Sequence, residues 1–321
     1  MYNILNLILQ ILLGLFLLLF GAEWLVHGSM SLAIRLGVST LIASLTIISI
    51  GTSSPELFVS LNAVLEGNNS IAISNIVGSN ICNIGLILGL CIIIRPIKVH
   101  LNLLFFDISV LFIVTSFFVF IAFNKAIYKW HSVFFLITLI SYIVICIRNK
   151  KDKRFKSIKI KEKESSKNTT SFIIIDFLLI SNGSFMLFYG ADCIVEGIVK
   201  IGEFLEVSNT FIGLTIIALG TSLPELVTSL MAAYRKQEDI IIGNIIGSNI
   251  FNILGILGIV GIINPISIDN ISLLFFFLML ILTAFLFIFM FFCKKLSTKE
   301  GFFFISIFFL YYIFIFIYSF Y

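Results

Sequence analysis

Apolar runs of about membrane-spanning length fill most of this chain of 321 residues. A helix needs roughly 20 predominantly apolar residues to cross the ~30 Å hydrocarbon core of a bilayer. Hydrophobic residues make up 60% of the sequence, well above the roughly half-apolar composition of soluble domains. The chain is therefore predicted to be an all-α polytopic membrane protein with ten transmembrane helices. The predicted spans are residues 4–26, 38–61, 71–94, 101–123, 133–147, 171–195, 210–233, 240–263, 271–292 and 301–320.

Basic residues are distributed unevenly over the connections between these spans. With residues 148–170 placed in the cytoplasm, 18 of the 21 Lys and Arg lie on the cytoplasmic side. Such a bias sets orientation, so both termini are predicted to be extracellular. The basic residues thus describe membrane topology, and no nucleic-acid partner is expected. Residues 148–170 are interpreted as a solvated cytoplasmic linker, too short to bury a core, with contact to anionic lipid or a regulatory contact as the alternative.

Two stretches of twenty residues repeat one another. "SLTIISIGTSSPELFVSLNA" at residues 44–63 and "GLTIIALGTSLPELVTSLMA" at residues 213–232 agree at 13 positions. A second pair, "SNIVGSNICNIGLILG" at 74–89 and "GNIIGSNIFNILGILG" at 243–258, follows at the same offset of 169 residues. The sequence is therefore duplicated, with no insertion between the motifs of either half.

Each half of the duplication holds five predicted spans. Because five is odd, the second half must cross the membrane in the opposite sense, so the sequence predicts two inverted-topology five-helix repeats. These are residues 1–147 and 171–321, with the repeated motifs at about 44–96 and 213–265. Many secondary transporters place a midplane site between such repeats. The alternative is a duplicated scaffold with no transport role.

Each repeated motif places a Pro-Glu pair inside an apolar span. A carboxylate at this depth costs about 2.5–3.5 kcal/mol on insertion scales, so it normally faces a partner or a wet cavity. The core spans contain no Lys or Arg to pair with Glu56 or Glu225, so a bound ion or a proton should balance them. The proline before each glutamate lacks a backbone donor and is predicted to open its helix near Gly51 and Gly220.

Hydroxyl and amide side chains accompany both carboxylates, and on the neighbouring spans a Ser and an Asn share one helix face at i, i+4 spacing. These groups offer hard oxygens, which suit Ca²⁺ and Na⁺ better than zinc or copper. Two carboxylates would balance one Ca²⁺ and could equally be neutralised by Na⁺ ions. Competition of Ca²⁺ and Na⁺ for one set of oxygens would be the physical basis of an exchange of these ions. Close helix packing is the alternative explanation for the small motif residues. The grouped side chains are Thr52, Ser53, Ser79 and Asn83, and Thr221, Ser222, Ser248 and Asn252.

The motifs "GTSSPE" and "GTSLPE", followed by "GSNICN" and "GSNIFN", resemble the paired alpha-repeats of the sodium/calcium exchanger family of the calcium/cation antiporter superfamily. The resemblance covers nearly the whole chain. It implies an antiporter that exchanges Na⁺ for Ca²⁺ by alternating access, with the first and sixth spans sliding across the core. It also implies the ion ligands Glu56, Thr52, Ser53, Ser79, Asn83, Glu225, Thr221, Ser222, Ser248 and Asn252, with backbone carbonyls from Ser49 and Ala218.

Asn252 departs from this resemblance, because many family members carry Asp there. Exchange coupled to H⁺ or K⁺ therefore stays open, with an uncoupled cation channel or a calcium sensor as further alternatives. Glu23 and Asp192, near the ends of the first and sixth spans, are interpreted as interfacial charges. We expect no cofactor beyond the transported ions and a functional monomer. The predicted location is the plasma membrane of a prokaryote, with an organellar membrane as the alternative.

Overall fold

The computed structural model describes residues 4–98, 101–149, 169–204, 218–268, 273–293 and 295–318, which are helical apart from four two-residue strands and short turns. The first half contains α1 (Ile4–Leu36), α2 (Thr40–Ala43), η1 (Ser44–Ile48), α3 (Ser49–Thr52), α4 (Ser54–Leu65), α5 (Asn69–Cys82), η2 (Asn83–Leu88), α6 (Gly89–Ile94), β1 (Ile97–Lys98), α7 (Leu101–Ala122), β2 (Ala126–Ile127) and α8 (Lys129–Asn149). The second contains α10 (Thr169–Phe204), α12 (Ala218–Gly220), α13 (Leu223–Tyr234), α14 (Glu238–Ile250), η4 (Phe251–Ile256), α15 (Leu257–Ile263), β3 (Ile266–Ser267), α16 (Leu273–Phe292), β4 (Lys295–Leu296) and α17 (Thr298–Tyr318).

Long apolar helices confirm the all-α polytopic membrane fold. In the described residues, seven helices are long and apolar enough to span a bilayer, and the bent pair at residues 40–65 makes an eighth. The predicted spans 210–233 and 301–320 extend outside the described residues, so the count of ten stays a prediction. α1 continues ten residues beyond its predicted end at Val26 and stops before Gly37, whose left-handed φ of 72° ends the helix.

Two short antiparallel strand pairs join the two halves of the chain, and each half contributes one strand to each pair. β1 pairs with β4, and β2 pairs with β3. The offset of 169 residues relates β1 to β3 and β2 to β4, so the two pairs are pseudo-symmetric copies of one another. Each pair also joins two connections that the basic-residue distribution assigns to the same side of the membrane. The halves are therefore interleaved rather than packed as two separate bundles.

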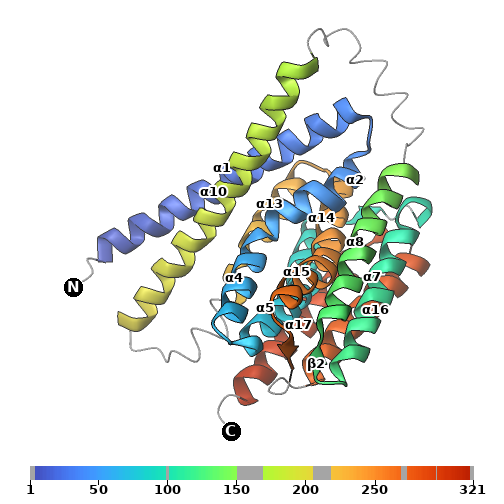
Figure 1. Ribbon diagram of the computed structural model, residues 1–321. Helices are drawn as coiled ribbons and strands as arrows, with labels where there is room; N and C mark the ends of the chain where they lie inside the picture. The colour runs from blue at the N-terminus through green and yellow to red at the C-terminus, as the bar shows by residue number, and fades with distance from the viewer. Residues whose placement is uncertain are drawn as a thin grey trace.

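α1 and α10 lie side by side at one edge of the molecule and cross the remaining helices obliquely (Figure 1). Glycines let these two antiparallel helices touch through their backbones. A Cβ added at Gly21 would lie 2.9 Å from the carbonyl oxygen of Gly183, and one at Gly14 would lie 2.7 Å from that of Gly190. The offset relates Gly14 to Gly183 and Gly21 to Gly190, so the contact itself is pseudo-symmetric. Large apolar side chains on both helices stay exposed, as expected for surfaces that face lipid.

Candidate ion-binding site

Both motif helices are broken just ahead of the Pro-Glu pair. Ser53 separates α3 from α4 with φ −84° and ψ 10°, and the two segments meet at 44°. Ser222 precedes α13 with nearly the same angles, −85° and 4°. The predicted openings near Gly51 and Gly220 thus fall two residues later than expected. Proline is favourable in the first turn of a helix, so a new helix starts immediately before it.

At the first break, a side-chain hydroxyl donates to the backbone carbonyl that proline leaves without a hydrogen bond. Pro55 cannot donate to the carbonyl of Gly51, and the hydroxyl of Ser54 donates to that oxygen instead, at 2.5 Å. Leu223 stands at the equivalent position of the second half and has no hydroxyl. At the first break, a side chain of the same helix therefore satisfies the free carbonyl, and Leu223 cannot do this at the second break.

The two motif glutamates are fully buried and are linked across the pseudo-symmetry. Ser53 Oγ donates to Glu225 Oε1 at 2.7 Å, and Ser222 Oγ donates to Glu56 Oε1 at 3.3 Å. Each carboxylate thus belongs to one half and is held by a hydroxyl of the other. Ser248 adds a contact to Glu225 Oε1 at 3.4 Å. The crossed pairs place four predicted ligands, and both halves, at one location.

Several oxygens at this location have room for a further partner. Within the described part of the chain, Glu56 Oε2 and Glu225 Oε2 are buried without a hydrogen bond. The same holds for the side-chain amides of Asn83 and Asn252. Asn83 begins the π-helical turn η2, and Asn252 is the second residue of η4. These turns pack against the motif helix of the opposite half, α13 and α4 respectively. π-Helical turns are frequent at functional sites.

The remaining predicted ligands lie on the motif segments or on α5. Among the described residues, Ser79 Oγ is buried without a hydrogen bond, and Thr52 Oγ1 lies 3.5 Å from Ser248 Oγ. Thr221 lies one residue before Ser222 in the same break. The carbonyl of Ser49 accepts from Ser53 N at 3.0 Å and from Thr52 Oγ1 at 3.3 Å, so it serves the helix as well. Ala218 is the first residue of α12.

Two segments of the chain, residues 6–148 and 175–317, match a family model described as sodium/calcium exchanger protein. The chain belongs to this family. The two matches begin 169 residues apart, which equals the offset of the motifs. Members of the sodium/calcium exchanger family are antiporters, so the chain is a transporter rather than an enzyme.

Relatives of this family member agree with that assignment. The chain is 38% identical to the uncharacterized membrane protein MJ0091 of Methanocaldococcus jannaschii, over 74% of this chain and 76% of that one. It is 31% identical to the sodium/calcium exchanger MaX1 of Methanosarcina acetivorans, over 83% and 86%. A solved structure of the sodium-calcium exchanger NCX_Mj superposes with a TM-score of 0.83 at 31% identity, covering 96% of this chain and 98% of that one.

Sequence reasoning missed two buried residues beside the candidate site. Asn75 and Asn244 are buried, and each accepts a hydrogen bond from the motif threonine of the other half. A signal was available, because Asn75 plus 169 is Asn244, and both lie one turn before a motif serine. The i, i+4 stripe on each helix is therefore one residue longer than predicted.

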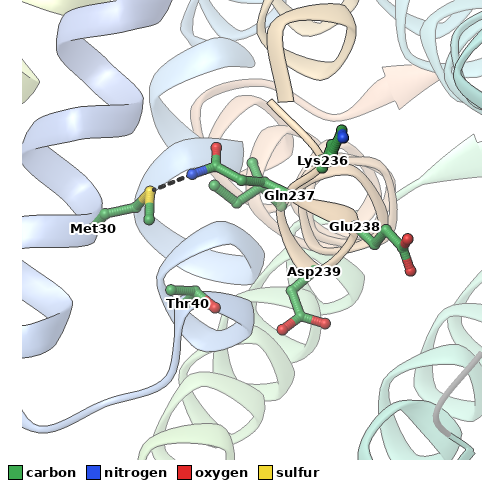
Figure 2. Close-up of a pocket in the computed structure, with 7 residues that line it drawn as sticks. Met30, Thr40, Lys236, Gln237, Glu238 and Asp239 are labelled. Atoms are coloured by element: carbon green, nitrogen blue, oxygen red, sulfur yellow. Dashed lines mark hydrogen bonds between the residues drawn. The ribbon is translucent and has the colours of Figure 1, made fainter. Parts of the chain in front are cut away.

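Glu23 and Asp192, the charges predicted to be interfacial, are not buried in this family member. Glu23 of α1 is paired with Arg235 at 2.7 Å, and Asp192 is exposed. A pocket of about 310 Å³ opens nearby, where α1, α2 and the start of α14 meet. Figure 2 shows Met30 and Thr40 on one side of it and Lys236 to Asp239 on the other. This pocket is lined by none of the predicted ligands, and it lies between α1 and the core helices.

Proposed function

We propose that this chain exchanges Na⁺ for Ca²⁺, holding the ions between Glu56 and Glu225. The observation that carries the proposal is the pair of fully buried carboxylates, crossed by hydroxyls of opposite halves, each with one unpartnered oxygen. Within the described ranges, no Lys or Arg forms an ion pair with either carboxylate. Two buried negative charges in this situation need a cation, because an isolated ionised carboxylate is costly away from water. One Ca²⁺ balances both.

The chemistry of the surrounding groups supports hard cations. Ca²⁺ takes 6–8 oxygens in a flexible shell, and carboxylates, hydroxyls, amide oxygens and backbone carbonyls together supply that number. Na⁺ ions compete for the same oxygens and replace the same charge. The proposed ligands are Glu56, Glu225, Thr52, Thr221, Ser53, Ser222, Ser79, Ser248, Asn83 and Asn252, with the carbonyls of Ser49 and Ala218.

The exchange unit is proposed to be a monomer, because both carboxylates and their partners come from one chain. We place it in the plasma membrane of a prokaryote with extracellular termini, on the strength of the basic cytoplasmic connections. The long helices α1 and α10 are proposed to move across the core between the two access states.

Calcium uptake by proteoliposomes tests the proposed function. Purified protein is reconstituted, and ⁴⁵Ca²⁺ uptake is followed under an outward gradient of Na⁺, of K⁺ or of H⁺. We expect uptake with the Na⁺ gradient and little with the other two. Uptake driven only by K⁺ or H⁺ would replace sodium with that ion, and uptake that ignores every gradient would defeat the antiporter mechanism.

Asn252→Asp is expected to make exchange depend more strongly on pH. An amide keeps the charge of the centre set by the two glutamates alone, whereas an aspartate adds a third group that binds and releases a proton. Exchange rates are measured from pH 6 to pH 9 for both proteins, at fixed sodium and calcium gradients. Identical profiles would mean that Asn252 acts through packing or direct sodium coordination.

A further inference from the structure

Two asparagines next to the carboxylates connect each motif helix to the opposite half. Asn75 lies on α5 and Asn244 on α14, at positions related by the repeat offset. Thr221 Oγ1 donates to Asn75 Oδ1 at 3.2 Å, and Thr52 Oγ1 donates to Asn244 Oδ1 at 3.2 Å. The same contact is therefore made twice, once in each direction across the pseudo-symmetry.

The orientation of each amide is fixed by its own half. Asn75 Nδ2 donates to the carbonyl of Glu56 at 3.1 Å and to Ser60 Oγ at 3.0 Å. Asn244 Nδ2 donates to Ser229 Oγ at 3.0 Å. With the amide nitrogen committed in this way, only the oxygen is directed at the threonine of the other half, and it can only accept.

This fixed acceptor controls where the threonine hydroxyl sends its proton. A hydroxyl has one proton and two lone pairs, and it ligates a cation only through its oxygen. When the proton is given to Asn Oδ1, the lone pairs of the threonine oxygen are left for another partner. Without that acceptor, the proton of Thr52 is left to the carbonyl of Ser49 at 3.3 Å, which turns the hydroxyl back toward its own helix and occupies a second proposed ligand.

We propose that Asn75 and Asn244 are positioning residues that orient the hydroxyls of Thr221 and Thr52 for cation binding. The inference rests on the proposed function, because it assigns these threonines a bound Ca²⁺. Outer partners that orient metal ligands are known to matter, since their loss weakens metal affinity about 10- to 100-fold. The two asparagines do not themselves need to touch the ion.

The test compares Asn75→Leu with a matched control on the same helix. Asn80 is also a buried amide of α5, but its Nδ2 faces Met279 Sδ at 3.7 Å and not a motif threonine. Calcium binding to purified protein in sodium-free buffer is measured by titration calorimetry, and folding by thermal unfolding. We expect Asn75→Leu to weaken calcium binding about 10-fold or more, and Asn80→Leu to change it less than about 3-fold.

A double-mutant cycle separates positioning from packing. If Asn75 acts through Thr221, then Asn75→Leu in a Thr221→Ala background should weaken binding by less than about 3-fold further. Fully multiplicative effects, or equal effects of Asn75→Leu and Asn80→Leu, would overturn the inference. Should Asn75→Leu fail to fold, the symmetric set of Asn244→Leu, Thr52→Ala and Asn249→Leu gives the same decision.

The parent protein distinguishes this inference from the proposed function. Calcium binding by the parent together with unchanged binding by Asn75→Leu removes only the positioning role. No calcium binding and no calcium uptake by the parent would remove the proposed function, and the inference with it.

Discussion

Glu56→Gln and Glu225→Gln are each expected to abolish calcium transport while leaving a folded protein. Glutamine keeps the size of the side chain and an oxygen that accepts from the crossed serine, at Ser222 or Ser53. It removes one of the two charges that balance Ca²⁺. Removing one partner of a buried charge pair costs about 3–5 kcal/mol, which corresponds to a loss of affinity of about 100-fold or more. Calcium uptake into proteoliposomes is the measurement.

An exposed glutamate on the same segment provides the control for this experiment. Glu66 follows α4 and is exposed, so Glu66→Gln should transport calcium like the parent. Expression of the Glu56 and Glu225 variants should hold or rise, because an amide is less costly than a carboxylate inside the membrane. Parental calcium uptake by either variant would exclude that carboxylate from the ion-binding site.

Gly183→Val is expected to destabilise the protein strongly by separating α1 from α10. A Cβ at Gly183 would lie 2.6 Å from the backbone nitrogen of Leu25 and 2.8 Å from the carbonyl oxygen of Gly21. Neither backbone atom can rotate away, so the two helices must move apart along their contact. Such overpacking costs about 1–3 kcal/mol or more. The thermal unfolding midpoint of the purified protein measures the loss.

Ser181 is the matched control, because it lies on the same helix two residues earlier and its side chain is exposed. Ser181→Val should leave the unfolding midpoint nearly unchanged. Gly14→Val is related to Gly183→Val by the repeat offset, and its Cβ meets the carbonyl oxygen of Gly190 at 2.7 Å. It should therefore destabilise the protein similarly. Equal midpoints for Gly183→Val and Ser181→Val would show that the helices do not depend on backbone contact.

The sequence was sufficient for the fold class and the family, and physical reasons explain why. Apolar runs identify the membrane spans, and the constant motif offset identifies the duplication. Both can be predicted without knowledge of tertiary contacts. Helix length was harder to predict. α1 and α10 extend well past their apolar segments because each packs against the other, a tertiary contact that the apolar runs do not record.

The candidate site was predictable as a set of residues but not as a network. Spacing placed Ser79 and Asn83 on one face, yet it could not indicate that Ser53 would bond to Glu225 rather than to Glu56. That choice depends on how two distant helix breaks meet in space. Asn75 was missed for the same reason, because its role appears only when Thr221 of the other half lies beside it. The assignment of individual residues as ion ligands stays a prediction.

The crossed hydrogen bonds also set an order of events during biosynthesis. Glu56 leaves the ribosome 166 residues before Ser222, and Thr52 leaves it 192 residues before Asn244. The first half must therefore enter the membrane with polar groups whose partners have not yet been made. β1 likewise cannot pair until β4, the strand that precedes α17, has been synthesised. A nascent chain that stops after five spans should thus be a target for membrane quality control, and only the complete chain can bury its own charge.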